Sequence, residues 1–188
     1  MALTKIVDAT VEPVTLAEAK AHCRVDSSDD DAYLTTLITV ARTAAEDRTQ
    51  RTLMTTTWRL LVDAFPDAIK LPMPRIIGVS SVQYVATDGT IATLDPGGYT
   101  VDTASEPGWV VPSYEQEWPQ VREQINAVSV LYTAGYGTTP SAVPAPIRHW
   151  ILLAVGEMYA ERERSAEKPA VPHQFVDGLL DPYRILAV

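Results

Sequence analysis

A hydrophobic period of about 3.6 residues runs through residues 28–51 and is the longest regular pattern in the chain. Its apolar positions follow the i, i+3, i+4, i+7 spacing that lines one face of an α-helix; they are Leu34, Leu37, Ile38, Ala41, Ala44 and Ala45. Ser28 is suited to the N-cap position, and Asp31 to the third residue of a capping box. Arg48 and Arg51 place positive charge at the end where the helix dipole favours it. The pattern predicts a long amphipathic helix whose apolar face another element must cover.

Two further helices are predicted on either side of the middle of the chain. Thr15 and Glu18 form a T-x-x-E capping box that opens a short helix over residues 16–23. Pro144 and Pro146 suit the entrance of a second long helix. Its apolar stripe at helical spacing consists of Ile147, Trp150, Ile151, Ala154, Val155 and Met158. We expect this helix to pack on the helix of residues 28–51.

The end of the chain predicts a linker followed by a short helix. Residues 165–174 are charged and rich in proline, as is typical of a linker. Residues 175–185 are amphipathic, and the predicted helix is broken near Asp181 and Pro182.

Between residues 52 and 137 the period changes from helical to alternating. Trp58, Leu60 and Val62 lie on one face of a predicted strand. Asp88-Gly89 stands between two β-prone runs and predicts a hairpin. The predicted strands are residues 55–62, 69–71, 79–87, 91–94, 99–102, 109–111 and 127–133. Residues 1–14 are expected to be an extended lead-in, and residues 112–124, with two prolines and no period, a long surface loop.

These elements predict an α+β fold. A small helical bundle, with two N-terminal helices and one long and one short C-terminal helix, carries a mostly antiparallel β insertion. The length of 188 residues suits a single domain over residues 1–188. We expect residues 15–51 and 144–164 to form the helical core and residues 52–137 the β insertion. Residues 165–188 form the linker and the C-terminal amphipathic segment.

Charge and composition limit the partners of the protein. The net charge of −9 disfavours tight DNA binding, because nonspecific affinity for DNA comes from Lys and Arg. No stretch approaches the roughly 18 apolar residues of a membrane span, so no membrane partner is expected. The N-terminus lacks the apolar core of a secretory signal, and Cys23 is the single cysteine. Synthesis in a reducing cytoplasm is therefore expected.

No pattern in the sequence predicts a catalytic, cofactor-binding or metal site. His22 and Cys23 diverge on a helix, so a surface histidine and a buried cysteine are expected. His149 and His173 are isolated. The acidic run at residues 26–31 lacks the spacing of an EF-hand and is better explained by helix capping. No phosphate loop or nucleophile elbow is present. The alternatives of another class are a small hydrolase or metal-dependent enzyme and a DNA-binding regulator.

Two groups of apolar and aromatic residues lie in segments without a strong packing pattern. Trp109, Tyr114 and Trp118 surround the predicted long loop. The second group follows the linker and consists of Phe175, Val176, Leu179, Leu180, Tyr183 and Ile185. Either group closes over the core or forms a protein interface, where aromatic anchors and tethered amphipathic helices recur.

Several motifs, in order, resemble those of a known family. They are EPVTLAEAK at residues 12–20 with RVD at 24–26, TTW at 56–58, TAGYG at 133–137, and VPAPIR at 143–148. The chain from about residue 11 to about residue 185 is similar to the head-tail connector, or adaptor, proteins of tailed bacteriophages, which also occur in prophages and gene transfer agents. None of the motifs is a catalytic signature.

This resemblance implies a structural virion protein at the head-tail interface, made in the host cytoplasm. It implies a ring of identical subunits, usually a dodecamer, beneath the portal protein, through which double-stranded DNA passes without specific binding. An acidic surface suits such a channel, because it does not hold the phosphates. The further partner is a tail stopper or tail completion protein, and the alternative within this class is that the chain is itself such a tail-side component.

The resemblance also implies which residues meet these partners. The C-terminal segment of the family engages the portal, and the matching residues are Phe175, Val176, Leu179, Leu180, Tyr183, Arg184 and Ile185. For contacts between subunits or with the tail, the hypothesis is Trp109, Tyr114 and Trp118.

Overall fold

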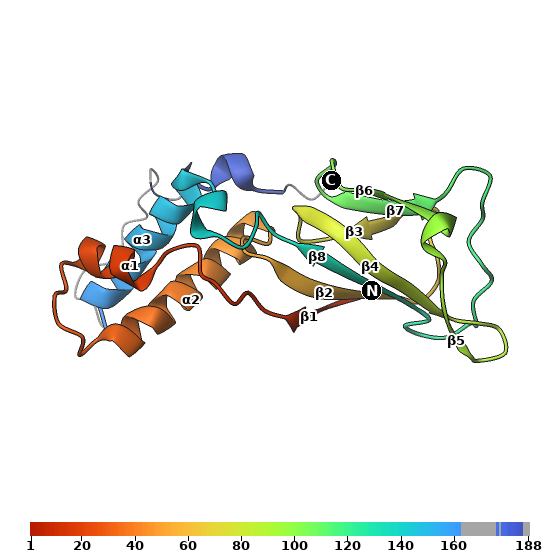
Figure 1. Ribbon diagram of the computed structural model, residues 1–188, viewed down its shortest axis with the longest axis horizontal. Coiled ribbons are helices and arrows are strands. Elements are labelled where there is room, and N and C mark those ends of the chain that lie inside the picture. Colours follow the sequence, from red (N-terminus) through yellow and green to blue (C-terminus); the bar gives the residue numbers. More distant parts are fainter. Residues whose placement is uncertain (163–175, 177, 186–188) are drawn as a thin grey trace. The chain divides into compact units, whose positions relative to one another are not determined.

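The computed structural model describes residues 1–162, 176 and 178–185, and the chain forms two compact units (Figure 1). The sheet unit comprises Met1–Ala9 and Thr55–Gly135, and the helical unit comprises Thr10–Met54 and Tyr136–Val188. These boundaries lie close to the predicted limits of the β insertion at residues 52 and 137. The predicted α+β class is confirmed, while the assignment of residues 1–188 to a single domain stays a prediction.

The helical unit is built from three α-helices within its described residues. They are α1 (Leu16–Cys23), α2 (Asp31–Thr49) and α3 (Ala145–Ala160), with short 3-10 helices η2 (Pro140–Ala142) and η3 (Asp181–Tyr183). Helix α3 packs on α2, as predicted, and α1 contacts both. The apolar faces predicted from the sequence are buried, with Leu34, Ile38 and Ile151 almost inaccessible to solvent. No helix of the described residues is long and apolar enough to span a membrane.

The capping box of α1 is present, but the predicted cap of α2 is wrong. Thr15 and Glu18 make both reciprocal bonds at the start of α1. Helix α2 begins at Asp31 rather than near Ser28, and its N-cap residue Asp30 makes no side-chain capping bond. The Asp30 carboxylate instead accepts hydrogen bonds from the α3 residue Tyr159, at 2.6 Å, and from an arginine that follows α3. The acidic run was expected to support helix capping, but the Asp30 carboxylate makes a tertiary contact instead.

The sheet unit contains two antiparallel sheets, which confirms the predicted strand pairing. The five-stranded sheet has the order β1-β2-β8-β4-β5, with bounds Ala2–Val7, Thr56–Val62, Val128–Ala134, Ile76–Val85 and Ile91–Thr93. The three-stranded sheet has the order β3-β7-β6, with bounds Ile69–Leu71, Gly108–Pro112 and Tyr99–Asp102. The Asp88-Gly89 hairpin joins β4 and β5 as predicted.

Two strands differ from the sequence prediction. Residues 1–14 were expected to be an extended lead-in, but Ala2–Val7 forms an edge strand paired with β2. Strand β4 begins at Ile76 rather than at residue 79. Register shifts between Ile76 and Gly78 and between Val79 and Ser81 interrupt its alternation of buried and exposed side chains. Bulges of this kind hide a strand from an analysis based on a period of two.

The core of the sheet unit lies between the two sheets. Leu60, Val82 and Val130 of the larger sheet and Leu71 and Val110 of the smaller one are fully buried in one cluster. These residues occupy alternate positions of their strands, so one face of the five-stranded sheet is directed to this core.

Candidate functional site: the C-terminal segment

The described end of the chain is hydrogen-bonded to the C-terminal end of α2, within the helical unit. The Ile185 N–H donates to the Thr49 carbonyl at 3.0 Å. The Arg51 Nε donates to the carbonyl of Tyr183. Helix α2 ends at Thr49, and its C-cap residue Gln50 has a left-handed φ of 55°. Backbone carbonyls are the acceptors in both bonds, so the segment is held independently of the side chains at residues 183 and 185.

The residues predicted to face the portal have unequal exposure. Leu180 is only 1% exposed and belongs to the core of the helical unit. Four are half-buried, namely Val176, Leu179, Tyr183 and Ile185, and Arg184 is exposed. Phe175 and the linker of residues 165–174 lie outside the described residues. The predicted break near Asp181 is present as the 3-10 helix η3. The portal contacts themselves stay a prediction, and Leu180 has a structural position within its own chain.

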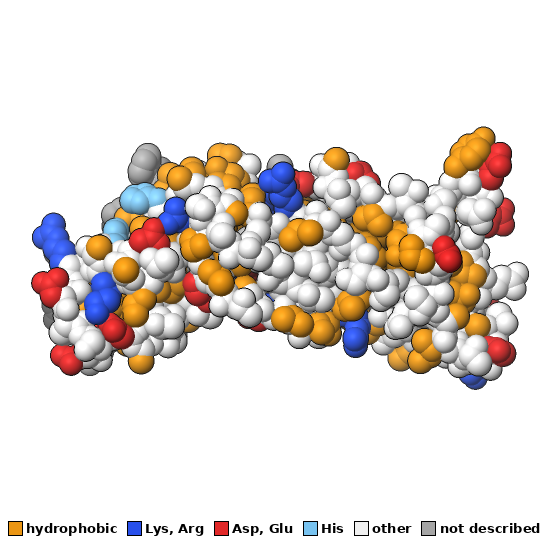
Figure 2. Space-filling model, viewed as in Figure 1, with side chains coloured by type: hydrophobic (Ala, Val, Ile, Leu, Met, Phe, Trp, Pro, Cys, Tyr) orange, Lys and Arg blue, Asp and Glu red, His pale blue; other side chains and the backbone are white. Residues whose placement is uncertain are grey.

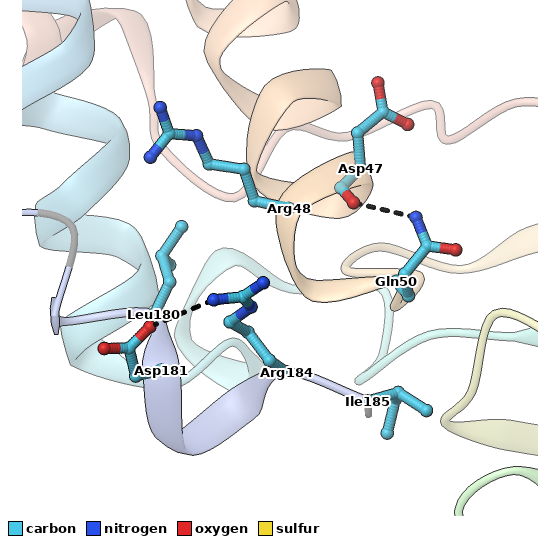
Figure 3. Close-up of a pocket in the computed structure, with 7 residues that line it drawn as sticks. All are labelled: Asp47, Arg48, Gln50, Leu180, Asp181, Arg184 and Ile185. Carbon is cyan, nitrogen blue, oxygen red and sulfur yellow. Dashed lines mark hydrogen bonds and ion pairs between the residues drawn. The ribbon is translucent and has the colours of Figure 1, made fainter. Parts of the chain in front are cut away.

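A hollow of about 560 Å³ separates this segment from the end of α2. It is lined by Asp47, Arg48, Gln50, Leu180, Asp181, Arg184 and Ile185. Figure 3 shows the side chains of Leu180 and Arg184 directed toward the end of α2. Arg184 and Asp181 approach at 3.6 Å, and both are more than half exposed, so this pair adds little stability. The lining has charges of both signs, from Asp47 and Asp181 and from Arg48 and Arg184.

A buried ion cluster holds α2 in place beneath this segment. Arg42 is 1% exposed. It donates to Glu12 at 2.7 Å and to Glu46 at 3.1 Å. Glu46 also accepts the backbone N–H of Leu53 at 2.9 Å, just beyond the end of the helix. The sequence analysis missed this cluster. Its one local signal is the i, i+4 pair of Arg42 and Glu46 on the apolar side of α2.

A second ion pair joins the start of α1 to α3. The Glu18 carboxylate accepts the Thr15 backbone N–H at 2.8 Å and also pairs with Arg148. These interactions lower the pKa of Glu18, chiefly through the Thr15 N–H, although partial burial opposes the shift. Arg148 also donates to the carbonyl of Pro13 at 2.9 Å. The cluster fixes the chain that enters α1 against α3.

We expect the Glu18 cluster to make the helical unit sensitive to acid. A carboxyl whose pKa is lowered by folding contributes stability above its unfolded pKa, about 4.3 for glutamate, and loses that contribution as the pH falls through the folded pKa. Urea unfolding between pH 6 and pH 3 measures this. Glu18→Gln should lose less stability between pH 6 and pH 3 than the unmodified protein does. Glu157→Gln changes an exposed residue of α3 and should lose as much stability as the unmodified protein. Parallel curves for Glu18→Gln and the unmodified protein would contradict the assignment.

The three aromatic residues around the long loop have different environments in the sheet unit. Tyr114 is 89% exposed. Trp118 is half-buried and stacks on Phe65, with ring centroids 4.6 Å apart and planes at 8°. Trp109 is half-buried in β7. Tyr114 alone is freely accessible, and the predicted subunit or tail contacts of all three stay a prediction.

The remaining candidate ligands do not gather into a site. Cys23 is half-buried rather than buried, because the last residue of a short helix is only partly covered; its desolvation raises the pKa of the thiol. His22 and His149 are exposed. No group of His, Cys, Asp and Glu within the described residues is arranged to hold a metal ion.

Comparisons with known proteins find a family match over part of the chain. Residues 13–83, which span α1, α2, β2, β3 and most of β4, match the family model of the phage gp6-like head-tail connector protein. No curated protein sequence matches the chain. The match confirms the predicted resemblance to head-tail connectors, a class of structural proteins rather than of enzymes.

Solved structures extend the likeness in fold to the whole chain. A chain in the neck of an empty gene transfer agent particle, computed with C6 symmetry, has 23% identity and a TM-score of 0.82; the alignment covers 100% of this chain and 97% of that one. A chain in the virion of a native gene transfer agent particle has 22% identity, a TM-score of 0.82 and the same coverage. A chain in the neck of the native particle, computed with C12 symmetry, has 23% identity and a TM-score of 0.78, again with 100% and 97% covered. The fold is therefore that of neck proteins over its full length.

Proposed function

We propose that this protein is a structural head-tail connector that assembles as a ring in the neck of a phage-like particle. The observation that carries the proposal is the match in fold to neck chains, which covers 100% of this chain and 97% of the neck chain. The family match over residues 13–83 supports the same role from the sequence. The protein has no enzymatic activity in this proposal.

The ring lies between the portal protein and a tail stopper or completion protein, and double-stranded DNA passes through it. The net charge of −9 supports a channel that does not retain phosphates. A ring requires heterologous contacts between subunits whose rotation closes, and the particle with C12 symmetry supports a dodecamer. The half-buried and exposed residues of the C-terminal segment meet the portal in this proposal.

Native mass spectrometry of the purified protein, alone and mixed with the portal protein of the same genome, tests the proposal. We expect a ring-sized species, either alone or on the portal. A protein that stays monomeric and ignores the portal would contradict the connector role. Binding to tail components without binding to the portal would favour the tail-side alternative.

Leu179→Asp and Tyr183→Ala should each weaken attachment to the portal by about 10-fold or more, as expected for apolar anchors at an interface. Both side chains are half-buried, and the Tyr183 carbonyl that accepts from Arg51 is retained in the variant. Co-purification with portal is the measurement, and circular dichroism checks the fold.

The matched control for this pair is Val40→Asp on α2, where the valine is 48% exposed. If both C-terminal variants bind the portal as the unmodified protein does, the C-terminal segment is not part of the portal interface. The connector role would then still be tested by native mass spectrometry.

A further inference from the structure

One face of the five-stranded sheet is uncovered within the sheet unit, and its paired strand positions carry a single charge. The register places Arg59 of β2 opposite Leu131 of β8, and Leu61 opposite Ser129. The other outward positions are Ala2, Thr4, Val7, Thr57, Gly78, Ser81, Gln83, Val85, Ile91, Thr93 and Thr133. We call this set, with Arg59, Leu61, Ser129 and Leu131, the outer face. It contains no Asp or Glu, although carboxylates outnumber Lys and Arg in the chain.

Arg59 is exposed near the middle of this surface, and no ion pair of its guanidinium occurs within the described residues. Leu61 and Leu131 beside it are half-buried, and Ile91 at the edge is 75% exposed. Figure 2 shows one side of the molecule, with hydrophobic side chains exposed at several places over the strands. The outer face is therefore a weakly polar surface whose one cation, Arg59, has no ion pair among the described residues.

The same unit carries a projecting turn with the complementary chemistry. Tyr114 is 89% exposed, and Glu115 and Glu117 beside it are exposed. The Gln116 N–H donates to the Ser113 carbonyl at 2.9 Å and closes the turn. We call residues 113–117 the loop tip. It presents one aromatic ring followed by two carboxylates, and neither carboxylate pairs with Arg59 of its own chain in the described structure.

The loop tip is held in this conformation before any partner binds. The Ser113 N–H donates to Gly98 at 3.1 Å, and Trp118 stacks on Phe65 just beyond the tip. Glu115 has a φ of 60°, a left-handed conformation that residues with a side chain adopt at a cost. A rigid exposed aromatic loses little entropy on binding, which favours its use as an anchor.

We propose that the loop tip of one copy docks on the outer face of the neighbouring copy in the ring. Tyr114 packs against Leu61 and Leu131 of the neighbour, and Glu115 or Glu117 pairs with Arg59. This inference rests on the proposed function, because it names the contact that closes the ring. The occupant is a second copy because heterologous closure needs two different, complementary surfaces on one chain. Copies that carry a net charge of −9 repel one another, which favours a contact that joins carboxylates to an arginine on a surface without acids.

Charge reversal tests the contact, with ring formation on the portal measured by native mass spectrometry. Arg59→Glu should reduce ring formation at least 10-fold, and the double variant Glu115→Arg, Glu117→Arg should do the same. Combining all three changes in one chain should restore the ring, because the pair is re-formed with opposite sign. Lys70→Glu, a reversal at an exposed position of β3, is the matched control and should have no effect. Ring formation unchanged by Arg59→Glu, or no restoration in the triple variant, overturns the inference.

A cross-link keeps this result separate from the proposed function. Gln116→Cys and Ser129→Cys in a Cys23→Ser background keep Tyr114, Leu61 and Leu131, and under oxidising conditions they should give a disulfide between copies, on the portal and in concentrated protein without portal. A ring that forms on the portal without this cross-link overturns the docking contact but leaves the connector role intact. A protein that ignores the portal yet forms the cross-link supports the contact and contradicts the connector role.

Discussion

Glu46→Ala is expected to lower the free energy of unfolding by about 2 to 3 kcal/mol, because it removes one of the two carboxylates that pair with a buried arginine. Arg42 is 1% exposed and pairs with both Glu46 and Glu12. The change also leaves the Leu53 N–H without its carboxylate acceptor. Because a domain is stable by only about 5 to 15 kcal/mol, this loss should shift the unfolding transition measurably.

Urea unfolding followed by circular dichroism measures this effect. Glu46→Gln keeps an acceptor for Leu53 but not the charge opposite Arg42, so it should lose less stability than Glu46→Ala. Glu157→Ala on α3 removes an exposed carboxylate and serves as the matched control, with an expected change within about 0.5 kcal/mol. A loss below about 1 kcal/mol for Glu46→Ala would show that the cluster does not support the helical unit.

Leu180→Asp is expected to destabilise the helical unit by at least about 3 kcal/mol. Its side chain is 1% exposed, and the substitution removes apolar burial and also places an ionisable group in the core. Leu180→Ala should cost about 2 to 3 kcal/mol, because it creates a cavity without a buried charge. Thermal unfolding and limited proteolysis at the C-terminal segment are the measurements.

Arg184→Ala is the control for the Leu180 variants, because Arg184 lines the same hollow but is exposed. Its change in stability should stay within about 0.5 kcal/mol. If Leu180→Asp keeps the stability of the unmodified protein and loses only portal binding, Leu180 belongs to the portal interface as the resemblance implied. Loss of stability would instead show that Leu180 supports the core of its own chain, unlike the other residues predicted to bind the portal.

Elements with short-range signals could be predicted from the sequence. Thr15 and Glu18 lie three residues apart, so the start of α1 depends on contacts within one turn. The alternation of β2 and the Asp88-Gly89 hairpin are also local, and the structure contains both. The stripe from Leu34 to Ala45 predicted the buried face of α2. The α+β class followed from the order of these elements.

The candidate site could be predicted only in part. The sequence identified the C-terminal segment and the loop that contains Tyr114, because both contain apolar residues without a packing partner nearby in sequence. It did not separate buried Leu180 from its exposed neighbour Arg184, since their burial depends on the end of α2, about 130 residues earlier.

The sequence by itself determined the helices, most strands and the acidic character of this protein, because period, capping and charge act between neighbouring residues. The tertiary structure decided which polar groups are partnered and which surfaces are left open. The Asp30 carboxylate accepts a hydrogen bond from α3 rather than capping its own helix. Arg42 pairs with Glu12, thirty residues away in sequence. Residues 2–7 become a strand only because β2 provides a partner. The outer face around Arg59 exists only once the strands align in register, because pairing between distant segments determines the neighbours of each side chain.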